Sequence, residues 1–187
     1  LGSNNTGEAT ISQFETLAAA GGATVDFTNI TDVEDLQVSG STVTLANLGA
    51  GDIEDQVSFA HNASVTIDNT ATETTLEFKG ASGSDGDLTI TNNAAALTEI
   101  VYEPGTTGTL TLTGTATKDL VIRGSEDVIL GGGGIAALTT IDARSASAVT
   151  ATANELSGIA DYKGSSGVDN IEIASLAANA SIDTGNG

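Results

Sequence analysis

The sequence predicts an all-β chain wound as a right-handed parallel β-solenoid (β-helix) of short strands. Three observations favour this fold: short strand-like segments recur along the chain, Thr and Gly are abundant (28 and 23 of 187 residues), and there is a single proline. Small residues suit a narrow core, and a stacked coil needs nearly every strand N–H for its ladder, which proline lacks. A β-sandwich or a tandem of small β-domains is the alternative.

Residues 1–22 are predicted to form an N-terminal segment with a short capping helix. Ser12 and Glu15 have the spacing of a capping box, in which a hydroxyl and a carboxyl group satisfy free N–H groups at a helix start. Residues 18–20 are alanines that would continue the helix, and the glycine pair at 21–22 would end it. We expect this helix to cover the end of the coil, with the repetitive solenoid occupying residues 23–187.

An internal repeat of about 40 residues organises the rest of the chain. Four segments have apolar residues at their second and fourth positions and close on glycine: 35–40, 75–80, 119–124 and 159–164. We therefore expect Gly40, Gly80, Gly124 and Gly164 to mark equivalent corners of one winding. Further strands fill each unit, at 41–45, 64–67, 87–90, 97–100, 109–112, 127–130, 138–141, 148–151 and 170–173. This spacing predicts about four strands per unit and about 20 residues per coil.

Three of the five basic residues occupy the same repeat position, immediately before the closing glycine. They are Lys79, Arg123 and Lys163. Stacking of the coils would place them in one row, where they would neutralise acidic neighbours on adjacent coils. The alternative is a basic stripe that binds lipopolysaccharide or another acidic surface glycan.

Composition excludes several classes of partner and site. The net charge of −20 argues against nucleic acids and anionic membranes, which require Lys and Arg to replace counterions. The absence of cysteine excludes disulfides and thiolate sites, and no apolar run is long enough to span a bilayer. His61 is the only histidine, so a transition-metal site is not expected. With six aromatic and five basic residues for substrate binding, the chain is predicted not to be an enzyme.

A glycine-aspartate turn pattern points to calcium. Residues 164–171 follow Gly-Gly-x-Gly-x-Asp-x-apolar with one glycine replaced by serine, and 80–88 and 124–130 are looser versions. Glycines permit the turn conformation that exposes carbonyl oxygens, and aspartate supplies the hard oxygen that Ca²⁺ prefers. The candidate metal residues are Gly83, Asp85, Asp87, Asp127, Gly167 and Asp169. The alternative is that these aspartates are ordinary solvated turn residues.

Residues 122–125, 138–143 and 162–169 resemble the repetitive surface proteins that bacteria export by type I secretion. In that family, strands rich in Thr and Ala alternate with calcium-binding glycine-aspartate (RTX) turns. Within it, the chain looks closest to the surface-layer (S-layer) proteins of Gram-negative bacteria. The resemblance implies an extracellular structural protein of the bacterial cell surface that self-associates with calcium into a lattice.

An alternative within the same resemblance is a repeat module of a large secreted adhesin, acting as a calcium-stabilised spacer or binding a ligand. The strong calcium sites of the family come from consecutive nonapeptides, whereas the turns here are isolated and imperfect. A site in this chain would therefore have to be completed by a neighbouring coil or a neighbouring molecule.

Overall fold

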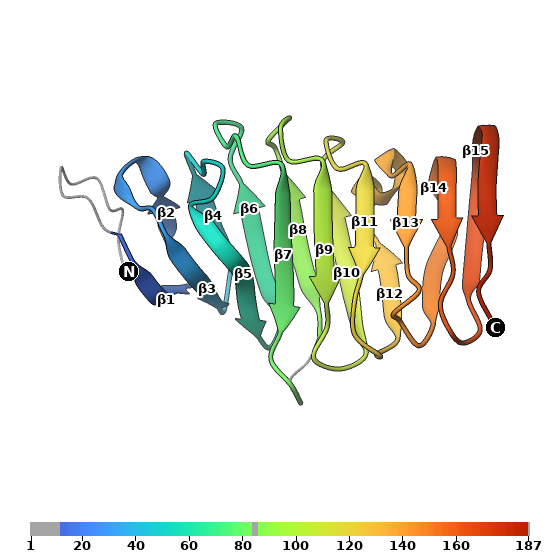
Figure 1. Ribbon diagram of the computed structural model, residues 1–187, viewed down its shortest axis with the longest axis horizontal. Helices are drawn as coiled ribbons and strands as arrows, with labels where there is room; N and C mark the ends of the chain where they lie inside the picture. Colours follow the sequence, from blue (N-terminus) through green and yellow to red (C-terminus); the bar gives the residue numbers. More distant parts are fainter. Residues whose placement is uncertain (1–11, 84–85, 187) are drawn as a thin grey trace.

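The computed structural model describes residues 12–83 and 86–186, with the backbone alone of residues 152–155. It confirms an all-β solenoid. In this part of the chain, 15 strands form one continuous sheet that winds around a horizontal axis from the N-terminus to the C-terminus (Figure 1). Two short 3-10 helices, η1 (Phe27–Asn29) and η2 (Gly133–Ala137), are the only helical segments in it. The predicted sandwich alternative is therefore excluded.

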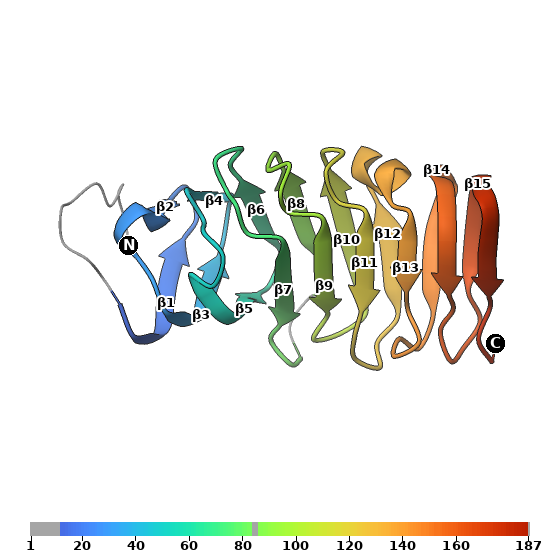
Figure 2. The same ribbon diagram turned by 45° about the horizontal axis from the view of Figure 1, so that its top comes forward.

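Successive strands alternate between two layers of the winding, both visible in Figure 2. The odd layer contains β1 (Phe14–Ala20), β3 (Val33–Ser39), β5 (Ile53–Ala60), β7 (Thr75–Gly80), β9 (Glu99–Glu103), β11 (Asp119–Ile122) and β13 (Thr140–Asp142). The even layer contains β2 (Thr24–Asp26), β4 (Val43–Ala46), β6 (Ala63–Ile67), β8 (Leu88–Asn92), β10 (Gly108–Thr113) and β12 (Val128–Gly131). The two layers join at the last coils, because β14 (Val149–Lys163) and β15 (Asn170–Asp183) each continue from the even layer into the odd layer.

Loops connect the layers at two corners, named here as they stand in Figure 1. The upper corner holds the connections from even to odd strands, and the lower corner those from odd to even strands. Residues on neighbouring odd strands pair in parallel register, as in the series Leu36, Val57, Phe78 and Tyr102. One coil is therefore 21 to 24 residues in this series, and the 40-residue repeat of the sequence corresponds to two coils.

The core is a stack of apolar side chains from both layers. Side chains alternate across a strand, so every second residue points inward. In the even layer, Leu88, Leu110 and Leu130 follow one another in register and are at most 1% exposed. In the odd layer, Leu120 and Ile141 form part of the corresponding column and are fully buried. Burial of each such side chain contributes roughly 1.5–3 kcal/mol, which favours this register over its one-residue slip.

The capping helix predicted near the N-terminus is wrong. Residues 14–20 form strand β1, which pairs in parallel with β3 from Thr16 opposite Asp35 to Ala20 opposite Ser39. The pairing buries Leu17 and Ala19, two residues apart, whereas a helix would present positions three or four apart. The alanines favour a helix, but intrinsic propensity is a weak determinant, and the tertiary pairing with β3 overrides it. The rest of the predicted cap, residues 1–11, lies outside the described residues.

The four repeat glycines all lie at the lower corner, at or just after the ends of odd strands, but in every second coil. Their registers also differ. Gly80 pairs with Phe59 and through it with Val38, whereas Gly40 comes two residues after Val38. The prediction that the four glycines share one corner is confirmed, but the prediction that they occupy equivalent positions is wrong. At Gly80 the requirement is space, because a Cβ atom would lie 2.5 Å from the backbone nitrogen of Gly105 on the next coil.

Candidate functional site

The predicted calcium residues that the structure describes are gathered at the lower corner, in the loops that lead into β8, β12 and β15. Asp87, Asp127 and Asp169 come directly before these three strands. Gly83 lies earlier in the first of these loops and Gly167 in the last, whereas Asp85 lies outside the described residues. The candidate site is therefore a series of corner turns along one edge of the solenoid.

The described aspartates stand in alternate coils. Strand β10 separates β8 from β12, and β14 separates β12 from β15. Two strand spacings amount to about 9–10 Å. Calcium holds its oxygen ligands at about 2.3–2.6 Å, so carboxylates this far apart do not share one ion. In the described ranges, no group of three or more His, Cys, Asp or Glu side chains is placed to hold a metal ion.

Asp169 has a complete set of hydrogen-bond donors from the protein itself. Its Oδ1 accepts from the Val149 backbone N–H at 2.9 Å and from the Ser165 hydroxyl. Its Oδ2 accepts from the Tyr162 hydroxyl at 2.8 Å and from the Ser165 N–H at 2.9 Å. A carboxylate has about four lone-pair positions, so these four bonds satisfy it. The side chain thereby connects its own turn to Val149 on the preceding coil.

The same hydrogen bonds shift the pKa values of Asp169 and Tyr162. Burial alone would raise the pKa of Asp169, but the hydrogen bonds from Ser165, Tyr162 and Val149 together outweigh it and lower the pKa. Burial, with the hydrogen bond to Asp169 and its negative charge, raises the pKa of Tyr162 far above its usual value. Tyr162 therefore stays protonated and donates, while Asp169 stays ionised and accepts. The pair acts as a clamp across the lower corner.

The corner before β8 is built in a similar way. Asp87 Oδ1 accepts from the Thr109 N–H of the next coil at 2.7 Å. The Tyr102 hydroxyl, buried inside the coil, donates to the Gly86 carbonyl. Two of the predicted calcium ligands thus bond backbone amides of adjacent coils. The described residues do not fit a shared calcium site, and calcium bound near Asp85 or between two molecules stays a prediction.

The odd layer carries a charged face, defined as the outward side chains of β7, β9, β11, β13 and the end of β14, together with Arg123 and Arg144, which follow β11 and β13. Lys79 Nζ lies 3.5 Å from Glu103 on the next coil, and Arg123 lies 2.6 Å from Glu77, two coils away. Neutralisation of acids on other coils, predicted for the basic row, is confirmed for these residues. Lys79 and Arg123 share one column, with Glu103 between them. Lys163 stands two positions away from that column, so the single row was wrong.

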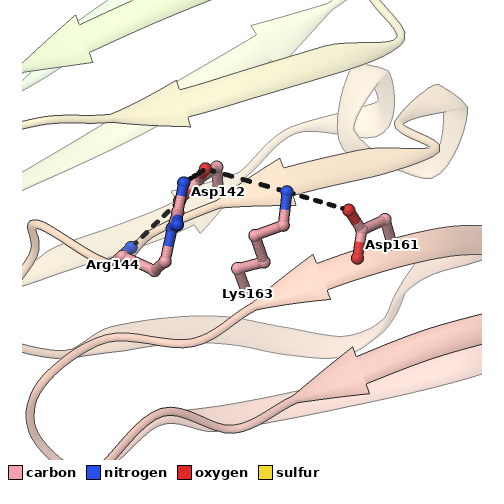
Figure 3. Close-up of polar contacts among 4 residues, drawn as sticks. All are labelled: Asp142, Arg144, Asp161 and Lys163. Carbon is pink, nitrogen blue, oxygen red and sulfur yellow. Dashed lines mark hydrogen bonds and ion pairs between the residues drawn. The ribbon is translucent and has the colours of Figure 1, made fainter.

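A cluster of four charges closes this face near the C-terminal end (Figure 3). Asp142 accepts from Arg144 at 2.6 Å and lies 4.0 Å from Lys163 Nζ, which is 3.0 Å from Asp161. The hydrogen bond from Arg144 is the main cause that lowers the pKa of Asp142, and it raises the pKa of Arg144. Arg144 was not among the predicted residues. It follows Arg123 by one coil of 21 residues, a spacing that could have revealed it.

The even layer carries a hydroxyl face, formed by two columns of outward side chains on β2, β4, β6, β8 and β10. One column is Thr24, Thr44, Thr66, Thr91 and Thr113. The other is Thr42, which directly precedes β4, with Ser64, Thr89 and Thr111. Hydroxyl groups bond along the columns, from Thr113 to Thr91 at 2.9 Å and from Thr42 to Ser64 at 3.2 Å. The Thr-x-Thr pattern was visible in the sequence, but only the coil register assembles it into one surface.

Comparison of the chain with known protein families, with curated proteins and with solved structures finds no match. Within the part of the chain that the structure describes, no helix has the length and apolar character needed to cross a membrane.

Proposed function

We propose that this chain is a rigid structural repeat of a secreted bacterial surface assembly, of the kind that self-associates into an S-layer lattice. The observation that carries the proposal is a stack of parallel coils with a strongly acidic composition. One continuous apolar core runs through the described coils, and each coil packs on its neighbours, which makes the stack rigid.

Charge supports a controlled form of this association. A net charge of −20 makes two copies repel each other at low ionic strength. Divalent cations would relieve the repulsion, and the RTX resemblance makes calcium the expected cation. The acidic character of the chain would then keep subunits apart until they reach a calcium-rich exterior. We therefore propose that copies of the chain assemble in a calcium-dependent way.

The test follows the assembly of the chain against calcium. Light scattering and electron microscopy would compare the chain in calcium and in chelator at fixed ionic strength. We expect sheets or long polymers in calcium and separate particles in chelator. Equal particle size in calcium and chelator would contradict the proposal.

The second candidate is a spacer module of a large secreted adhesin. It is favoured by the uniform coil repeat, which gives a rod in which each coil supports only its neighbours. Electron microscopy separates the two, since a spacer gives isolated rods in calcium. The glycan-binding alternative is less favoured, because Lys79, Arg123 and Lys163 each lie within 4 Å of a carboxylate. A glycan array with these three residues changed together would test it.

A further inference from the structure

The hydroxyl face is a two-dimensional grid. Its two columns run along the solenoid axis with one residue per coil, the first over five coils and the second over four of them. Neighbouring strands lie about 4.8 Å apart, and the columns are separated by two residues along each strand, about 6.6 Å. Each grid point is a Thr or Ser side chain. The surface therefore presents a hydroxyl group, and in nearly every case a methyl group, at regular intervals in both directions.

The grid is rigid before anything binds. Thr is β-branched, which restricts its rotamer, and the hydroxyl bonds between Thr113 and Thr91 and between Thr42 and Ser64 fix it further. Directly beneath lie inward residues of the same strands that are at most 2% exposed, including Val65, Ile90 and Leu112. A preorganised surface loses little conformational entropy on binding.

Charge is kept off the grid. The chain has 25 acidic residues, yet none occupies a position in the two columns. Acids border the grid instead: Asp26 and Asp68 lie toward the upper corner, and Asp87 lies at the lower corner. Ionised side chains orient water around themselves, so a charge in the grid would disturb a regular layer of water. The segregation indicates an uncharged, periodic partner.

We propose that the hydroxyl face binds ice. Water molecules at an ice surface occupy fixed positions with repeat distances of the same order as the two spacings of the grid. Hydroxyl groups on a rigid lattice can replace water molecules in that layer, and the methyl groups fill the spaces between them. Binding a solid whose molecules are already ordered also avoids the entropic cost of immobilising free water.

Crystalline polysaccharide is the other periodic, uncharged solid to consider. Proteins hold sugar rings largely by stacking them on exposed aromatic side chains. Among the described residues, Phe14 on β1 is the only aromatic side chain among the exposed large hydrophobic residues, and it belongs to the odd layer. The hydroxyl face has no aromatic platform in its two columns, which favours ice. This inference is independent of the proposed lattice function.

The test measures the partition of fluorescently labelled protein into a slowly growing ice hemisphere, together with inhibition of ice recrystallisation. We expect the chain to be incorporated into ice. Thr89→Tyr and Thr66→Tyr each place a bulky ring in the grid and should reduce incorporation by at least about tenfold, as for the loss of a central interface contact. Thr91→Val, which keeps the shape and removes the hydroxyl, should cause a smaller loss.

The matched control is Thr75→Tyr, because Thr75 is exposed on β7 of the charged face. It should enter ice as the unchanged chain does, and urea unfolding would show that all variants are folded. Exclusion of the unchanged chain from ice would overturn the proposal. Equal losses in Thr75→Tyr and Thr89→Tyr, or binding to crystalline chitin or cellulose in place of ice, would also overturn it.

Discussion

The charged face and the hydroxyl face differ in their outward side chains although both cover the same kind of apolar core. Both lie on strands of the same winding with the same spacing, and each has a column of apolar residues beneath it. On the charged face, acids alternate with bases and the pairs cross from coil to coil. On the hydroxyl face, neutral side chains bond along their own columns. The coil therefore constrains only its inward residues and leaves each outer surface open to specialisation.

The distribution of basic residues sharpens this contrast. All five lie between residues 79 and 163, and four of them are ion-paired on the charged face. The fifth, Lys118, donates from Nζ to the carbonyl oxygens of Thr115 and Ala137 near the upper corner. Lys and Arg side chains therefore lie where acidic side chains stack on neighbouring coils. The hydroxyl face has no such stack, because the acidic residues beside it stand at the corners.

The largest expected effect tests whether the two layers share one core. Leu110→Ala removes an inward side chain behind the hydroxyl face, and Leu120→Ala removes one behind the charged face. Both residues are fully buried. We expect each change to lower the free energy of unfolding by about 3 kcal/mol. Urea denaturation measures both. Losses that differ by more than about a factor of two would show that one layer dominates the stability.

The clamp at Asp169 joins the two layers, and its removal is the next largest effect. Asp169→Ala leaves the Val149 N–H and the Tyr162 hydroxyl without their acceptor, at an expected cost of about 2 kcal/mol. The matched control is Asp127→Ala, since Asp127 is another predicted calcium ligand and is exposed. It should change stability by less than about 0.5 kcal/mol. Equal effects, present only in calcium, would instead support metal binding at both positions.

Acid should weaken the charged face and spare the hydroxyl face. The pKa of Asp142 is lowered in the folded protein, so its stabilisation is present above its unfolded pKa, about 3.9, and is lost as the pH falls through the folded value. Asp52 acts in the opposite direction, because burial raises its pKa and protonation relieves that cost. In urea titrations from pH 6 to pH 2, Asp142→Asn should lose less stability than the unchanged chain. Thr91→Val should lose as much stability over this pH range as the unchanged chain.

Much of the fold could be predicted from the sequence, because alternation and repeat length are local properties. The positions of the four repeat glycines predicted that they share one corner of the winding, and all four lie at the lower corner. The helix prediction failed because pairing of β1 with β3 is a contact between residues about 19 apart, which a local capping pattern does not contain. The two-residue offset of Lys163 also escaped, because corner loops of different length shift the register.

The candidate site was less predictable for the same reason. The sequence identified Asp87 and Asp169 as corner residues but not their donors, which come from another coil at Thr109 and Val149. The tyrosine that completes the clamp, Tyr162, lies seven residues before Asp169 and points to it across the turn. Which groups satisfy a turn carboxylate depends on stacking, and stacking is visible only once the register is known.

The smallest expected effect concerns the ion pair between Arg123 and Glu77. The pair passes over β9, where Val101 stands in register between Glu77 and Val121. Val101 points outward and yet is 4% exposed, so we infer that the long Arg123 side chain covers it.

Surface ion pairs contribute about 0.2–1 kcal/mol to stability, and this contribution weakens as salt screens the charges. A double-mutant cycle with Arg123→Ala and Glu77→Ala should give a coupling of about 0.5 kcal/mol that falls with added salt. Arg123→Ala alone should cost more than Glu77→Ala, because it also uncovers Val101. Equal single losses, or a coupling unchanged by salt, would show that the charged face is held by something other than paired charge.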